Sequence, residues 1–163
     1  MIHLGTSGYA YDQWRRIFYP RGLPVRRWLE RYAQVFGSVE LNATFYRLPR
    51  PGAARAWHDA TPRGFVFAAK GSRYLTHMKR LTDAAQGLGR YFERIHGLGR
   101  KLQVVLWQLP PQMTGPDPAR LRAFLRELPR GRLRHAFEFR SEGWYTNEIC
   151  DVLDERGAAF CEH

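Results

Sequence analysis

The chain has 163 residues, of which 44% are hydrophobic and 14% aromatic, so it favours one folded domain over a disordered chain. It contains no run of about 18 uncharged apolar residues, which excludes a membrane-spanning helix. The formal net charge of +11 keeps a nucleic-acid partner open as an alternative.

The positive charge is concentrated in the first part of the chain. Residues 1–110 carry 18 basic and 6 acidic groups, whereas residues 111–163 carry 8 and 9. Only three of the 26 basic residues are lysines, and an arginine excess of this kind also arises from genome composition alone. The charge therefore marks either a polyanion-binding surface or an ordinary solvated one.

The N-terminus and the cysteines bear on location. The N-terminal residues lack the basic region, apolar stretch and cleavage site, in that order, of a signal peptide. Cys150 and Cys161 lie in a helix-like and a strand-like segment and form no close pair. We therefore expect a cytoplasmic protein with reduced thiols.

Short apolar strands alternate with helical patterns along the chain. The predicted strands are residues 2–5, 38–42, 65–70, 103–109, 134–139 and 158–162. Helical spacing of apolar residues is clearest over 28–36, 81–98, 118–128 and 147–153.

Two helix starts can be recognised from their capping residues. Asp117 is expected to cap a helix whose first turn holds Pro118. Either Thr146 or Asn147 is expected to cap the last helix. In total the pattern predicts about six strands and five helices.

This alternation predicts an α/β fold with a parallel sheet and outer helices. A doubly wound open sheet and a β/α (TIM-type) barrel both fit the alternation. The glycine-rich phosphate fingerprint of a nucleotide-binding open sheet is missing after the first strand, which favours the barrel.

Alternation within the strands places polar side chains on one face. In the second strand Val39 and Leu41 point one way, and Glu40, Asn42 and Thr44 point the other. Polar residues occupy the same kind of position near the ends of three other strands: Lys70, Gln108, Glu138 and Arg140. In a barrel these groups converge at the carboxyl-end mouth, where barrels bind ligands, although buried charges also form ion-pair layers without catalytic roles.

Five sequence blocks carry a resemblance to a known family. The blocks contain Gly5-Thr6-Ser7-Gly8; Glu40, Asn42, Thr44, Phe45 and Tyr46; Lys70, Thr76 and His77; Gln108, Pro110 and Pro111; and Glu138, Arg140 and Trp144. In this order they resemble the YecE-like family, a domain of unknown function. The resemblance implies a TIM-type barrel without an agreed activity.

The resemblance also implies that family members continue for two further β-α units. Residues 1–163 are therefore expected to form a single, incomplete barrel domain lacking its last two strands. Its first and sixth strands would keep open edges, through which oligomerisation is expected.

The favoured function is an enzyme that acts on a small anionic molecule by acid–base chemistry. Catalytic candidates are Glu40, Glu138 and Lys70. Substrate-binding candidates are Asn42, Tyr46, His77, Gln108, Arg140, Tyr9 and Trp144. The pattern does not distinguish a hydrolase, a lyase or an isomerase, and a paired-carboxylate glycosidase depends on a separation that the sequence does not give.

The sequence leaves three alternatives open. The first is a nucleic-acid-binding or nucleic-acid-processing protein, the second is a catalytically inactive fragment, and the third is a metal site. No cofactor is predicted, with a divalent metal as the alternative. The candidate ligands for such a metal are Glu40, His77, Glu138, Glu162 and His163.

Overall fold

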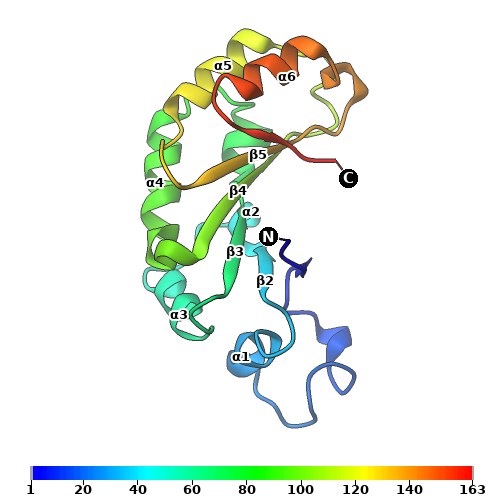
Figure 1. Ribbon diagram of the computed structural model, residues 1–163, viewed down its shortest axis with the longest axis vertical. Helices are drawn as coiled ribbons and strands as arrows, with labels where there is room; N and C mark the ends of the chain where they lie inside the picture. The colour runs from blue at the N-terminus through cyan, green and yellow to red at the C-terminus, as the bar shows by residue number, and fades with distance from the viewer. Residues whose placement is uncertain (1, 163) are drawn as a thin grey trace.

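Six parallel strands form one open sheet whose order along the sheet is the order along the chain (Figure 1). The computed structural model describes residues 2–162. The strands are β1 (Gly5–Ser7), β2 (Ser38–Leu41), β3 (Val66–Lys70), β4 (Leu102–Gln108), β5 (Arg134–Glu138) and β6 (Ala159–Phe160). The sheet confirms the predicted α/β class, and its sequential parallel order is that of a TIM-like barrel.

The outer side of a curved sheet is covered by α1 (Trp28–Tyr32), α3 (Ala53–Asp59), α4 (Ala85–Ile95), α5 (Pro118–Glu127) and α6 (Asn147–Asp154) (Figure 1). The short helix α2 (Ala43–Tyr46) instead follows directly on the end of β2. Short 3₁₀ segments and one π-helical turn, Tyr74–Met78, join them. No helix within residues 2–162 has the length and apolar character needed to cross a membrane.

The prediction of five helices is corrected at the end of β2. The strand stops at Leu41, and a single helical turn, α2, follows it directly. The hydroxyl of Thr44 donates to the carbonyl of Leu41 at 2.7 Å and also reaches the carbonyl of Lys70 at 2.6 Å. Thr44 is therefore buried at the turn instead of continuing the alternation of the strand.

The first strand also differs from its prediction. Apolar residues suggested a strand over 2–5, but Ile2 and Leu4 are 96% and 74% exposed and pairing begins only at Gly5. A Cβ atom at Gly5 would lie 2.1 Å from the carbonyl oxygen of Ser38. Glycine is required there because the two backbones approach so closely.

The apolar core lies between the sheet and the helices. The strands contribute side chains that are at most 2% exposed: Val39, Leu41, Phe67, Ala69, Val105, Trp107 and Phe137, with Phe139 just after β5. Tyr32, Tyr91 and Phe124 pack onto them from the helices. Each large apolar side chain buried in this way contributes about 1.5–3 kcal/mol. The predicted helix-facing side of each strand is thus the observed one.

Both predicted helix starts are present. The side chain of Asp117 accepts from the backbone NH of Arg120 at 2.9 Å, with Pro118 in the first turn of α5. Thr146 accepts from the backbone NH of Ile149 at 3.3 Å. Thr146, and not Asn147, is therefore the cap of α6.

A buried histidine lies within this core. Trp107 donates through Nε1 to Nδ1 of His135 at 3.2 Å, and Nε2 of His135 lies 3.3 Å from the carbonyl oxygen of Pro129. Because Nδ1 accepts, the ring proton belongs on Nε2 and the imidazole is neutral. Burial lowers the pKa of His135; the Pro129 carbonyl opposes this effect, and the charge of Arg156 adds to it.

This arrangement predicts an acid-sensitive stability. The folded-state pKa of His135 lies below the ordinary value of 6.5, so its contribution to stability is complete above about pH 6.5. The contribution is lost as the pH falls below that value. Between pH 7.5 and 5.5 the wild type should lose more unfolding free energy than His135→Asn, as measured by urea denaturation.

An exposed histidine supplies the control for this experiment. His96→Gln should keep the pH profile of the wild type, because the ring of His96 is exposed. Equal pH slopes for the wild type and His135→Asn would show that the buried ring does not cause the acid sensitivity.

Candidate active site at the carboxyl ends of the strands

Polar side chains occupy the inner face of the sheet at the carboxyl ends of its strands. Glu40, Lys70, Gln108 and Glu138 are the inward-facing residues at or next to the ends of β2, β3, β4 and β5. In the strand register Gln108 lies opposite Glu138 and Ser7 lies opposite Glu40. The side-chain alternation that buries the core on one face thus gathers these polar groups on the other.

Glu138 is the most buried acid of the group, at 4% exposure. Gln108 donates through Nε2 to its Oε1 at 2.8 Å, and Nε of Arg140 contacts the same oxygen. No hydrogen bond from residues 2–162 reaches Oε2. The carboxylate is therefore fixed through one oxygen while the other is available to a ligand.

Glu40 belongs to a second hydrogen-bonded group. Ser7 donates through Oγ to Oε1 of Glu40 at 2.7 Å, and Asn42 donates through Nδ2 to that hydroxyl at 2.9 Å. The other amide atom of Asn42, Oδ1, is buried and has no hydrogen-bond partner within residues 2–162. An unpaired buried acceptor is costly, so Oδ1 is suited to receive a donor from a ligand.

Lys70 and His77 are linked through an aromatic ring. Nζ of Lys70 lies 5.6 Å from the ring centroid of Phe45, within cation–π range, and His77 packs edge-on to the same ring at 5.0 Å. Burial lowers the pKa of His77, and the charges of Arg73 and Lys70 lower it further. His77 is therefore a neutral imidazole at pH 7.

The loop that carries His77 has an unusual backbone. It begins with the π-helical turn, a form often found at functional sites. Arg80, Leu81 and Asp83 then adopt positive φ angles of 48°, 70° and 46°. Each costs about 1–2 kcal/mol for a residue with a side chain. The buried side chain of Leu81, 3% exposed, and the hydrogen bond from its backbone NH to Leu75 hold the loop in place.

Cys161 lies directly after β6 and is influenced by the charged groups of this face. Burial raises the pKa of its thiol, and the charges of Glu138 and Glu40 raise it further. The charges of Lys70 and Arg140 act on the same thiol in the opposite direction. Charges carried at the ends of β2, β3 and β5 thus all act on the thiol of Cys161.

Sequence reasoning missed two members of this group. Ser7 ends β1 in register with Glu40, but the first strand was predicted too early for this position to be recognised. Cys161 was weighed only as half of a cysteine pair. Its position after a predicted strand was the signal that could have placed it at the mouth.

The three aromatic residues predicted to bind substrate differ in how exposed they are. Trp144 is fully buried, stacks on Phe139 at 5.0 Å and donates to the carbonyl of Met113, so it belongs to the core. Tyr9 packs against Tyr32 from the loop after β1. Tyr46 is 69% exposed and lies edge-on to Phe45, next to the group formed by Lys70 and His77.

Trp144 therefore packs in the core and does not form a pocket wall, whereas the predicted role of the half-buried Tyr9 stays a prediction. Large rings in loops after strands bury more apolar area against the helix ends than they would in an open mouth. Tyr46, which is exposed, and the half-buried Tyr9 stay candidates for contact with a ligand.

A metal site would need several His, Cys, Asp or Glu side chains close to one another. Within residues 2–162, no three His, Cys, Asp or Glu side chains lie close enough to one another to hold a metal ion. One candidate ligand, His163, lies outside the described residues.

Most of the chain is similar in sequence to known proteins. A family model described as "Protein of unknown function DUF72" matches residues 3–163. The UPF0759 protein YecE of Escherichia coli K12 is 28% identical over 140 residues, which are 86% of this chain and 48% of the relative. The UPF0759 protein YunF of Bacillus subtilis is 27% identical over 157 residues, 90% of this chain and 53% of the relative.

Solved structures agree with this match. A crystal structure of a DUF72 family protein from Thermotoga maritima superposes with a TM-score of 0.82 at 27% identity, covering 98% of this chain and 64% of that one. A DUF72 family protein from Enterococcus faecalis gives 0.75 at 19% identity, covering 98% and 60%. The chain spans about half the length of the curated relatives that it matches.

Proposed function

The chain belongs to the DUF72 family of proteins of unknown function, and we propose that it contributes to an enzyme active site for a small anionic molecule. The observation that carries this proposal is the carboxylate of Glu138, which is 4% exposed at the mouth and fixed through Oε1. Buried and oriented carboxylates on the inner face of a barrel mouth are suited to proton transfer.

The neighbouring groups supply distinct roles in this proposal. Glu138 moves a proton at Oε2, while Gln108 and Arg140 hold its carboxylate in one orientation. Glu40, oriented by Ser7, is the second acid–base group. Two carboxylates in different surroundings are the usual arrangement when one group donates a proton and the other accepts it.

Positive and neutral groups define the substrate class. Lys70, Arg73 and Arg140 place positive charge around the mouth, which favours a phosphate or carboxylate group on the ligand. The neutral His77 and the unpaired Oδ1 of Asn42 orient its hydroxyl or amino groups.

The test is a thermal-shift screen of phosphorylated and carboxylated metabolites, followed by turnover measurements on those that bind. A ligand present at about 100 times its Kd should add about 2.7 kcal/mol to the stability of the wild type. Lys70→Gln should weaken this binding. Glu138→Gln should bind at least as well as the wild type but turn over about 10²–10⁴-fold more slowly.

Arg94→Gln is the matched control, because it removes one positive charge from α4, away from the mouth. It should leave both binding and turnover unchanged. Equal turnover by the wild type and Glu138→Gln would overturn the acid–base role of Glu138. Equal loss of binding in Lys70→Gln and Arg94→Gln would overturn the anion site.

A further inference from the structure

Two neighbouring hollows lie at the amino ends of the strands, opposite the candidate active site. The first, of about 890 Å³, opens before β3 and β4 and is lined by Arg63, Arg100 and Lys101 among others. The second, of about 500 Å³, opens before β5 and β6 and is lined by the segments 128–135 and 155–158. Arg132 lines both hollows and joins them into one surface.

This surface, which we call the amino-end face, is strongly positive. Seven cationic side chains line the two hollows: Arg63, Arg100, Lys101, Arg130, Arg132, Arg134 and Arg156. None of the seven forms an ion pair with a carboxylate within residues 2–162.

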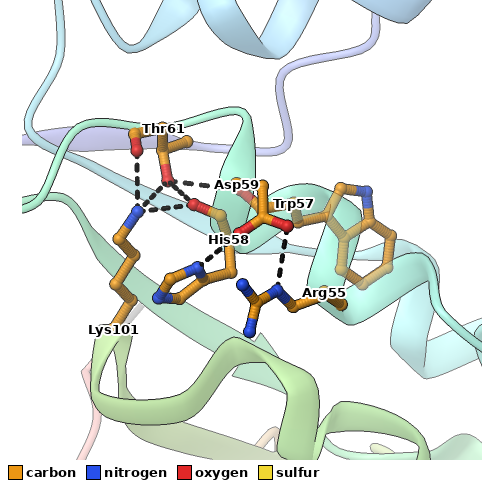
Figure 2. Close-up of polar contacts among 6 residues, drawn as sticks. All are labelled: Arg55, Trp57, His58, Asp59, Thr61 and Lys101. Atoms are coloured by element: carbon orange, nitrogen blue, oxygen red, sulfur yellow. Dashed lines mark hydrogen bonds and ion pairs between the residues drawn. The ribbon is translucent and has the colours of Figure 1, made fainter.

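The two carboxylates on this face are already engaged. Asp59 pairs with Arg55 at 2.8 Å and contacts His58 at 3.0 Å (Figure 2). Glu155 is held by two hydrogen bonds from Arg122, at 2.9 and 2.8 Å. The cations that line the hollows are therefore left without local neutralisation.

Two of the seven cations donate hydrogen bonds to carbonyl groups at the ends of helices. Lys101, which is 8% exposed, donates through Nζ to the carbonyl of His58 at 2.5 Å and to the carbonyl and hydroxyl of Thr61 at 2.7 and 3.0 Å (Figure 2). Arg156 donates to the carbonyl of Leu125 at 2.8 Å, in the last turn of α5. Both cations complement the negative end of a helix dipole.

The other five cations are exposed: Arg63, Arg100, Arg130, Arg132 and Arg134. They come from the loops before β3 and β5, from the 3₁₀ segment His96–Lys101 before β4, and from the first residue of β5. Arg132 is oriented by a hydrogen bond to the carbonyl of Arg100 at 3.0 Å. Guanidinium groups can bind phosphate oxygens in a bidentate manner, so these exposed arginines are suited to phosphate ligands.

The distribution of these arginines over two hollows indicates which kind of phosphate ligand the surface fits. A single phosphate would occupy one hollow, whereas arginines across two joined hollows match a chain of regularly spaced phosphates. The lining contains one Phe, Tyr or Trp residue, Phe65, which is 2% exposed, and of its two histidines His135 is buried and His58 contacts Asp59. The described part of the lining therefore offers little ring surface for stacking on unpaired bases. Among residues 2–162, no exposed large apolar side chain lines either hollow, which argues against insertion into a lipid surface.

We propose that the amino-end face binds the phosphate backbone of double-stranded nucleic acid without sequence preference. The site is separate from the candidate active site and does not depend on any ligand there. Contacts of this kind position a protein on a duplex but do not read bases.

The test is fluorescence anisotropy with a labelled DNA duplex of about 20 base pairs at several salt concentrations. The triple variant Arg63→Gln, Arg100→Gln, Arg132→Gln should bind at least about tenfold more weakly at low salt. Its slope of log affinity against log salt should be shallower by about 2–3, since each lost phosphate contact removes about 0.9. The corresponding triple lysine variant should retain most of the slope, because it keeps the charge.

A second triple variant, Arg21→Gln, Arg26→Gln, Arg50→Gln, makes the same change of charge on exposed residues outside both hollows. It should lose less than about twofold in affinity. Equal loss in the two glutamine variants would overturn the proposal in favour of diffuse charge. Tighter binding to single-stranded DNA, or equal binding to vesicles rich in anionic lipid, would also overturn it.

Discussion

Gly71→Ala should lower the free energy of unfolding by about 3 kcal/mol. A Cβ atom at this position would lie 2.2 Å from Cε3 of Trp107, a ring that is fully buried. The ring cannot move aside, because Tyr91, Phe124 and His135 surround it. Urea denaturation with circular dichroism measures the effect.

A double variant separates this clash from other effects of the substitution. In a Trp107→Leu background, Gly71→Ala should cost less than about 1 kcal/mol, because the opposing ring atoms are gone. Gly64→Ala is the control: a Cβ atom there has no neighbour within 4 Å. Since it only reduces the freedom of the unfolded chain, it should be neutral or stabilising by about 0.5 kcal/mol. The steric account fails if Gly71→Ala costs the same in both backgrounds.

Arg140→Met should lower the free energy of unfolding by about 2 kcal/mol at pH 7. It leaves the carboxylate of Glu138, whose side chain is 5% exposed, with Gln108 as its remaining polar partner. Arg140 itself is 40% exposed, so the effect should be smaller than for a fully buried ion pair. Chemical denaturation monitored by tryptophan fluorescence measures the difference.

Removing the charge that is left behind should reverse most of this loss. The double variant Glu138→Gln, Arg140→Met should recover more than half of the stability lost in Arg140→Met. Arg122→Met breaks a more exposed pair with Glu155 and should cost less than about 1 kcal/mol. If the two arginine variants cost the same, burial of Glu138 does not set the strength of its ion pair.

The sheet could be predicted from the sequence because its signals are local. Alternation of apolar and polar residues predicted which side of β2, β3, β4 and β5 faces the helices, and the same alternation placed Glu40 and Glu138 on the inner side. The hydrogen bond between Gln108 and Glu138 follows directly from their opposed positions in the register. Period-two patterns need no knowledge of the tertiary structure.

The elements that were missed depend on contacts between distant segments. The turn of α2 forms because Thr44 is held by the carbonyl of Lys70, 26 positions along the chain. Trp144 enters the core because Phe139 and Met113 provide a stacking surface and an acceptor. Neither contact produces a periodic pattern of residues in the sequence. Aromatic residues in loops were therefore predicted to line the pocket and not to pack in the core.

The exposed edge of β1 shows a similar limit. The apolar residues Ile2 and Leu4 look like strand residues, yet pairing with β2 begins at Gly5 because only glycine allows the backbones to approach. Oligomerisation through the edges of β1 and β6 stays a prediction, which size-exclusion chromatography can test.

The sequential order of the strands has a consequence for how the chain folds during synthesis. Each strand pairs with partners only 23 to 36 positions away, from Phe137 with Phe160 to Lys70 with Leu106. The entropy lost in closing each loop is therefore nearly the same at every step, because it grows only with the logarithm of loop length. As the ribosome releases each β-α unit, that unit can dock on the preceding one without waiting for any later strand of the sheet. Assembly from the N-terminus, one unit at a time, is thus the pathway that this topology favours.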